Sequence, residues 1–194
     1  MADYVNDVAQ VADQLSAPPI LIGHSYGGAV VQKYLESYTA PAGVLVASVP
    51  PQGLFETALR LALRHPWPFL KANLTLSLYP LVSTPALARD LFFSPGMAEE
   101  QVRTYQARMS DESFLGFLDM LALNLPKPER VKTPLLVLGA ANDTSFSRGQ
   151  VEATARAYHT QAVIFPNMNH AMMLEAGWQA VADRIISWLT EQGL

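Results

Sequence analysis

The chain has no cysteine, and only 15% of its 194 residues are charged. The lack of cysteine excludes disulfides and thiolate metal sites, and it is compatible with any compartment. The 13 basic residues form no cluster that resembles a phosphate-binding patch, and the net charge of -4 argues against a nucleic-acid surface. No segment reaches the roughly 18 uninterrupted apolar residues of a membrane span. We therefore expect neither a nucleic-acid partner nor a membrane span.

The N-terminus also lacks the pattern of a secretory signal. Residues 1–7 are acidic and amphipathic, whereas a signal peptide is first basic and then apolar. A cytoplasmic location is therefore the default expectation. The length fits one domain, and the 50% apolar content is enough for a substantial core.

Four short apolar runs, each bounded by Pro or Gly, are separated by helical stretches. This order predicts an α/β fold with a mainly parallel sheet flanked by helices. The predicted strands are residues 20–23, 43–48, 134–139 and 161–165. Helical spacing of apolar residues predicts flanking helices at 2–15, 29–37 and 177–192.

A long insertion, residues 52–130, separates the second predicted strand from the third, so the core comprises residues 1–51 and 131–194. Its pattern predicts four helices, at 54–64, 84–93, 98–108 and 111–123, with breaks at Pro66, Pro68, Pro80 and Pro95. Insertions of this length usually form a lid over a site. Its apolar side chains either line an acyl or aromatic pocket or pack the helices onto the sheet, so no substrate-binding residue is identified there.

The segment Gly23-His24-Ser25-Tyr26-Gly27 links an apolar run to a helical stretch. It has the Gly-x-Ser-x-Gly form of a nucleophile elbow, a tight strand-to-helix turn that exposes a serine hydroxyl. We expect Gly23 and Gly27 to lie where a side chain would crowd this turn. The alternative is a glycine-rich turn whose serine merely caps the helix.

A serine nucleophile needs a base, and the base needs an acid that orients it. Of the four histidines, only His170 lies in a loop just after a predicted strand and before a helix. Asp143 stands four residues after Gly139, where the third strand ends. Such positions meet at the carboxyl edge of a parallel sheet. We predict Ser25, His170 and Asp143 as nucleophile, base and acid; the alternatives are a histidine hydrogen-bonded for structure and an aspartate in a plain turn.

These motifs resemble the α/β-hydrolase superfamily, in its lid-bearing esterase, lipase and acyl-hydrolase branch. The resemblance rests on Gly-His-Ser-Tyr-Gly-Gly at 23–28, Gly-x-x-x-Asp at 139–143 and Asn-His-x-Met-Met-Leu-Glu at 169–175. It implies a serine hydrolase that cleaves an ester, thioester or similar acyl bond of a small molecule, or transfers the acyl group, without metal or cofactor. The amide of Tyr26 would be one oxyanion donor.

Two positions beside the histidine depart from the family pattern. Members often carry glycine where this chain has Asn169, and a polar residue where it has Ala171. We expect neither departure to affect the proton transfer.

The resemblance also implies strands before residue 20, the N-terminal half of the sheet, and a loop that gives a second oxyanion amide. Residues 1–19 supply neither, and loss of one such donor costs about 100- to 1000-fold in rate. We expect a truncated portion of a longer hydrolase, for example from a misplaced start at Met1. The alternatives are a degenerate member that only binds, and a subunit completed by a partner or a second copy through the exposed edge strand 20–23.

Overall fold

The computed structural model describes residues 1–194 and contains one four-stranded sheet. Its strands are all parallel and lie in the order β1 (Leu21–His24), β2 (Gly43–Val46), β3 (Leu135–Ala140), β4 (Ala162–Phe165). The predicted α/β class and parallel sheet are confirmed. Because all four strands are parallel, their carboxyl ends lie along one edge of the sheet.

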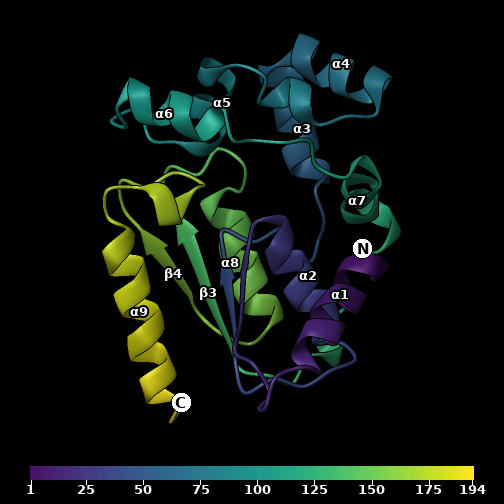
Figure 1. The fold of residues 1–194 in the computed structure, drawn as a ribbon, viewed down its shortest axis with the longest axis vertical. Coiled ribbons are helices and arrows are strands. Elements are labelled where there is room, and N and C mark those ends of the chain that lie inside the picture. Colours follow the sequence, from purple (N-terminus) through teal and green to yellow (C-terminus); the bar gives the residue numbers. More distant parts are fainter.

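Helices cover both faces of the sheet (Figure 1). One face is covered by α1 (Ala2–Ala12), α2 (Tyr26–Tyr34) and α8 (Arg148–Ala157), and the other by α9 (Trp178–Glu191). Successive strand residues point to opposite faces, so Leu45 packs with the first group and Val44 with Trp188 of α9. This two-sided burial is why β2 and β3 are apolar throughout.

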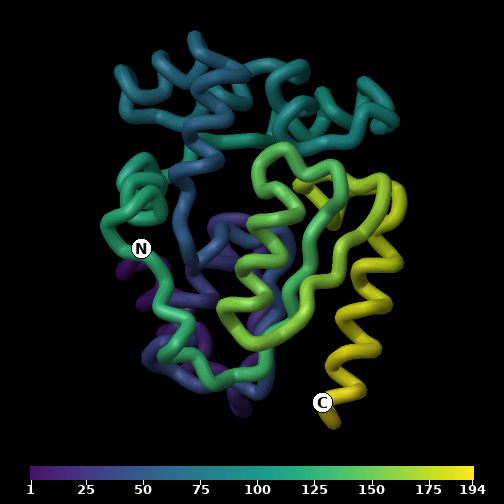
Figure 2. Tube along the Cα trace, turned by 180° about the vertical axis from the view of Figure 1, so that it is seen from behind, coloured from purple at the N-terminus to yellow at the C-terminus, as the bar shows by residue number.

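The insertion between β2 and β3 consists of short helical elements. They are α3 (Phe55–Arg64), α4 (Pro66–Thr75), η1 (Tyr79–Leu81), α5 (Pro85–Phe92), α6 (Glu99–Gln106), α7 (Phe114–Leu118), the π-helical turn η2 (Asp119–Leu123) and η3 (Pro128–Arg130). Helices α3 to α6 form a layer across the carboxyl ends of the strands, whereas α7 lies beside α1 (Figures 1 and 2). A further short helix, η4 (Met172–Leu174), follows β4. None of the helices combines the length and apolar character needed to cross a membrane.

The sequence missed one helix and misplaced several helix ends, including that of α1, which ends at Ala12 and not at residue 15. Helix α4 was not predicted because Pro66 counts as a breaker, yet Pro66 occupies the first helical position, where its missing N–H is not needed. The helix expected at 111–123 begins only at Phe114, since the Ser113 hydroxyl caps it by accepting from the Gly116 N–H. Helix α2 runs from Tyr26 to Tyr34 and not over 29–37.

Strand β1 lies at an edge of the sheet, as the sequence predicts. It pairs with β2 alone, and the side chain of Ile22 is 57% exposed. An apolar edge strand of this kind offers unpaired backbone groups to another chain.

Candidate active site

Ser25 occupies the turn between β1 and α2. Its backbone angles (φ 53°, ψ -120°) are strained, and residues other than glycine rarely adopt them. Its N–H donates to the Val46 carbonyl, and its own carbonyl accepts from the Val49 N–H, at 3.1 Å each. The loop after β2 thus holds the turn in place. The Ser25 side chain makes no capping hydrogen bond to α2, so the helix-capping alternative is wrong and the hydroxyl is available elsewhere.

Two glycines make the turn possible, and one of them is not the expected one. A Cβ on Gly23 would clash with the backbone of Gly27, as predicted. A Cβ on Gly27 would meet nothing within 4 Å, whereas one on Gly28 would overlap the Ser48 side chain. The expectation for Gly27 is therefore wrong: Gly28 is the helical residue that faces the loop after β2.

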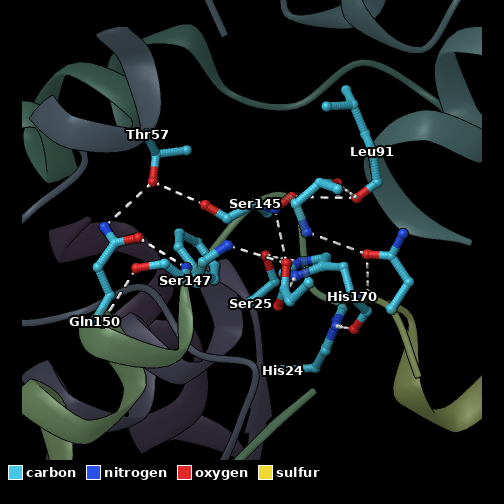
Figure 3. A network of polar contacts seen from close by, with 12 residues as sticks. His24, Ser25, Thr57, Leu91, Ser145, Ser147, Gln150 and His170 are labelled. Carbon is cyan, nitrogen blue, oxygen red and sulfur yellow. Dashed lines mark hydrogen bonds and ion pairs between the residues drawn. The ribbon is translucent and has the colours of Figure 1, made fainter. Parts of the chain in front are cut away.

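The structure brings together the three side chains that the sequence selects, and Figure 3 shows Ser25 beside His170. His170 Nε2 lies 2.9 Å from Ser25 Oγ, and His170 Nδ1 lies 2.9 Å from Asp143 Oδ2. The side chains of His170 and Asp143 are 1% and 0% exposed. We call these residues the Ser–His–Asp group; each follows a different strand, β1, β4 or β3.

The Asp143 carboxylate is oriented by the loop that follows it. Its Oδ1 accepts hydrogen bonds from the N–H groups of Ser145 at 2.7 Å and Phe146 at 2.9 Å. The other oxygen is left to accept the Nδ1–H of His170. Nε2 of the neutral imidazole then has a lone pair for the Ser25 hydroxyl proton. This arrangement can make the serine oxygen a nucleophile.

The imidazole of His170 is enclosed by three other rings. Its centroid lies 5.3 Å from those of Phe92 and Phe146 and 4.8 Å from that of His24. Burial, with the neighbouring His170 adding to it, lowers the pKa of His24 to about 4, so His24 is neutral near pH 7. Its Nε2–H donates to the His170 carbonyl at 3.0 Å, which positions the loop.

Polar residues of the insertion reach the loop after Asp143, and the sequence reasoning missed them (Figure 3). Thr57 Oγ1 and an Arg60 guanidinium nitrogen donate to the Ser145 carbonyl, at 2.9 and 2.6 Å. Thr144 Oγ1 donates to the Asp90 carbonyl at 2.6 Å. These partners are far apart in the chain, so no local pattern marks them.

A cavity of about 770 Å³ lies against Ser25 and His170. Most of its lining is apolar, with side chains from β1, α2 and the insertion, among them Leu54, Leu61, Phe69, Leu81, Phe92 and Phe117. Its lining includes two acidic residues, Asp7 and Glu112, and no lysine or arginine. This cavity is of the size that binds small molecules.

Tyr26 lines this cavity, and two of its polar groups have no hydrogen-bond partner in the chain. Its N–H donates to no acceptor of the chain, since it opens α2. Its hydroxyl is buried without a hydrogen-bond partner, and burial raises the pKa of Tyr26 to about 12. No group of three or more His, Asp or Glu side chains is placed to hold a metal ion.

Solved structures of known proteins share this fold. A monoacylglycerol lipase from Paleococcus ferrophilus is 20% identical with a TM-score of 0.69, and the match covers 98% of this chain and 75% of that one. An esterase from Exiguobacterium antarcticum and a bromoperoxidase from Bacillus anthracis are each 16% identical with a TM-score of 0.68, over 96% of this chain and 72% of theirs. At these identities the likeness shows the fold alone.

The family of the chain follows from a comparison of its sequence with family models. No curated protein sequence matches the chain significantly. The model of the alpha/beta hydrolase family matches residues 1–184, which is nearly the whole chain. The chain therefore belongs to the alpha/beta hydrolase family.

Proposed function

We propose that the chain is a serine hydrolase that cleaves a carboxylic ester, thioester or similar acyl bond through an acyl-enzyme. The observation that carries the proposal is the Ser–His–Asp group, with both contacts of His170 at 2.9 Å beside an apolar cavity. The strained turn at Ser25 is then a nucleophile elbow.

In this mechanism His170 Nε2 accepts the proton of Ser25 Oγ as that oxygen attacks the carbonyl carbon of the substrate. The imidazolium that forms is stabilised by Asp143. The negative charge on the tetrahedral oxygen is stabilised by the unpaired N–H of Tyr26 and by the N-terminal dipole of α2. His170 returns the proton to the leaving group, and water, activated by the same imidazole, then hydrolyses the acyl-enzyme. An alcohol in place of water would give acyl transfer.

The lining of the cavity favours an uncharged, apolar substrate. The insertion, which we propose acts as a lid, supplies apolar side chains such as Phe69 and Phe92. A negatively charged substrate would find no cation in this lining, and it would be repelled by Asp7 and Glu112. We therefore expect a nitrophenyl ester with an apolar acyl chain to be hydrolysed at least tenfold faster than one ending in a carboxylate. Equal kcat/KM values for the pair would contradict this expectation.

The direct test is reaction of the purified chain with a fluorophosphonate, followed by intact mass. We expect stoichiometric labelling of the wild type, and none after Ser25→Ala or His170→Ala. Ser187→Ala removes an exposed serine of α9 and should label like the wild type. A folded wild-type chain that does not label and hydrolyses no ester would overturn the proposal and support the alternative of a binding module.

A further inference from the structure

Asn169 precedes His170 in the loop between β4 and η4, and it is only 4% exposed. Its Oδ1 accepts from the N–H of His170 at 2.8 Å and from the N–H of Thr144 at 3.2 Å. Its Nδ2 donates to the Phe93 carbonyl at 3.0 Å. A backbone N–H only donates and a carbonyl only accepts, so these three partners fix the orientation of the amide.

The first two partners connect the base and the acid. Thr144 adjoins Asp143, so one oxygen atom holds the backbone of His170 and the backbone next to Asp143. A displacement of this oxygen therefore moves both sides of the 2.9 Å contact between His170 Nδ1 and Asp143 Oδ2.

The third partner connects this pair to the insertion. Phe93 directly follows the last residue of α5, and its carbonyl accepts from Asn169. On the other side of His170, the N–H of Ala171 donates to the Phe92 carbonyl at 2.9 Å. The histidine is thus fixed from both sides to consecutive carbonyls of the insertion.

We propose that Asn169 is a positioning residue, which holds His170 and Asp143 at hydrogen-bonding distance and couples both to the end of α5. It touches no reacting atom and does not line the cavity. The inference rests on the function proposed above, since it concerns the reactivity of the Ser–His–Asp group. Many family members carry glycine here, as noted above, and glycine has no side chain that could make these contacts.

The first test is Asn169→Ala, which removes all three hydrogen bonds. A misplacement of about 1 Å can cost on the order of 100-fold in rate. We expect kcat to fall about 10- to 100-fold and KM to change less than about threefold, because the cavity keeps its lining. Rates are expressed per Ser25 titrated with fluorophosphonate, so unfolded protein does not count.

The pH profile of kcat/KM separates positioning from loss of structure. The ionisable groups against His170 are Asp143 and His24, and His24 is neutral above about pH 4. Loosening the Asp143 contact disfavours the imidazolium, so Asn169→Ala should move the acid limb to lower pH. Asn169→Asp keeps the acceptor oxygen for the N–H groups of His170 and Thr144, replaces the Nδ2 donor to the Phe93 carbonyl by a second oxygen, and adds a negative charge. It should retain more of kcat than the alanine variant and move the acid limb to higher pH.

Thr154→Ala in α8 is the matched control. Thr154 is 1% exposed and its hydroxyl donates to the Gln150 carbonyl at 2.9 Å, so the variant loses a buried hydrogen bond outside the Ser–His–Asp group. Its Tm should fall while the rate per titrated site stays that of the wild type.

Three outcomes would count against the inference. An alanine variant with wild-type kcat per site and an unshifted acid limb would overturn it. If the alanine variant does not fold, the aspartate variant decides, and an unshifted acid limb there has the same meaning. A folded wild type without titratable Ser25 overturns the proposed function, and this inference with it, before any Asn169 variant is measured.

Discussion

The sheet and the helical insertion bury their apolar side chains to different extents. Every residue of β2 and β3 is buried. In the insertion, Leu63, Trp67 and Leu74 are 77%, 71% and 74% exposed. The sheet is stabilised by apolar burial on two faces, whereas the insertion is joined to the loops of the Ser–His–Asp group by polar contacts together with local apolar ones, such as that of Phe93 with Ala171. We infer from the comparison that the sheet sets the main positions of the Ser–His–Asp group, and that the insertion shapes the cavity and holds the loop of His170.

The largest effect is expected where the two regions meet, at Asp143. In Asp143→Asn, the amide oxygen would keep the N–H groups of Ser145 and Phe146, so the NH₂ would face His170. Nδ1 must then accept, which places the proton on Nε2 and removes the acceptor for Ser25. We expect kcat to fall about 10⁴-fold with an unchanged Tm. A loss of less than tenfold would show that the sheet does not set the reactive geometry in this way.

The comparison itself is tested by one leucine from each region. Leu138 in β3 is 0% exposed and Leu63 in α3 is 77% exposed. Leu138→Ala should lower the free energy of unfolding by about 2–5 kcal/mol through lost burial and a cavity. Leu63→Ala should change it by less than about 0.5 kcal/mol. Urea unfolding measures both, and similar values for the two variants would remove the distinction drawn above.

A third prediction concerns acid stability. The unfolded chain takes up a proton on His24 near its ordinary pKa of 6.5, whereas in the folded chain this pKa is about 4. The free energy of unfolding should therefore decrease as pH falls through this window, by about 3 kcal/mol in total. In His24→Gln this contribution disappears, so the unfolding free energy should depend less on pH between these values.

His159→Asn is the control for that experiment. His159 is exposed, and asparagine tolerates its positive φ of 56°. Its pH dependence should match the wild type. A His24→Gln variant with the wild-type slope would show that acid sensitivity arises elsewhere.

The smallest effect is expected for two neighbouring glycines of α2, whose alanine variants should differ in the free energy of unfolding. Gly28→Ala would overlap Ser48 and should destabilise the fold by about 1–3 kcal/mol. Gly27→Ala enters open space and should be neutral or stabilise by up to about 1 kcal/mol, as alanine favours helix. Ser48→Gly should restore part of the stability of Gly28→Ala. Equal losses for the two alanine variants would contradict this packing.

The sequence predicted the sheet and the helices α3, α5 and α6 of the insertion within about two residues, and it missed α4, for physical reasons. A strand such as β3, buried on both faces, is apolar throughout and ends in loops with recognisable residues, so Asp143 and His170 stood out. Helix α4 did not, because prolines break a helix or begin one depending on their position. The choice between Gly27 and Gly28 depends on Ser48, which local sequence does not place.

The apolar residues of the insertion show the same limit. Phe69 lines the cavity, Met120 is buried in the core, and Trp67 is exposed. In the sequence all three are simply large apolar residues of the insertion. Their different roles follow from tertiary packing, which the helical period does not encode. The role of Asn169 was missed for the same reason, since its partners come from three separate segments.

The insertion leaves β2, the one strand whose carboxyl end carries no member of the Ser–His–Asp group. Four of its main-chain carbonyls, those of Asp90, Leu91, Phe92 and Phe93, accept hydrogen bonds from the residues that adjoin His170 and Asp143. Carbonyls are common to all amino acids, so these contacts depend on the backbone path, whereas those of Thr57, Arg60 and Phe92 depend on the side chain. Residues 52–130 can therefore be exchanged in principle: an unrelated helical segment that brings carbonyls to the same points, and side chains that replace Thr57, Arg60 and Phe92, would give a new cavity without altering the reactive residues.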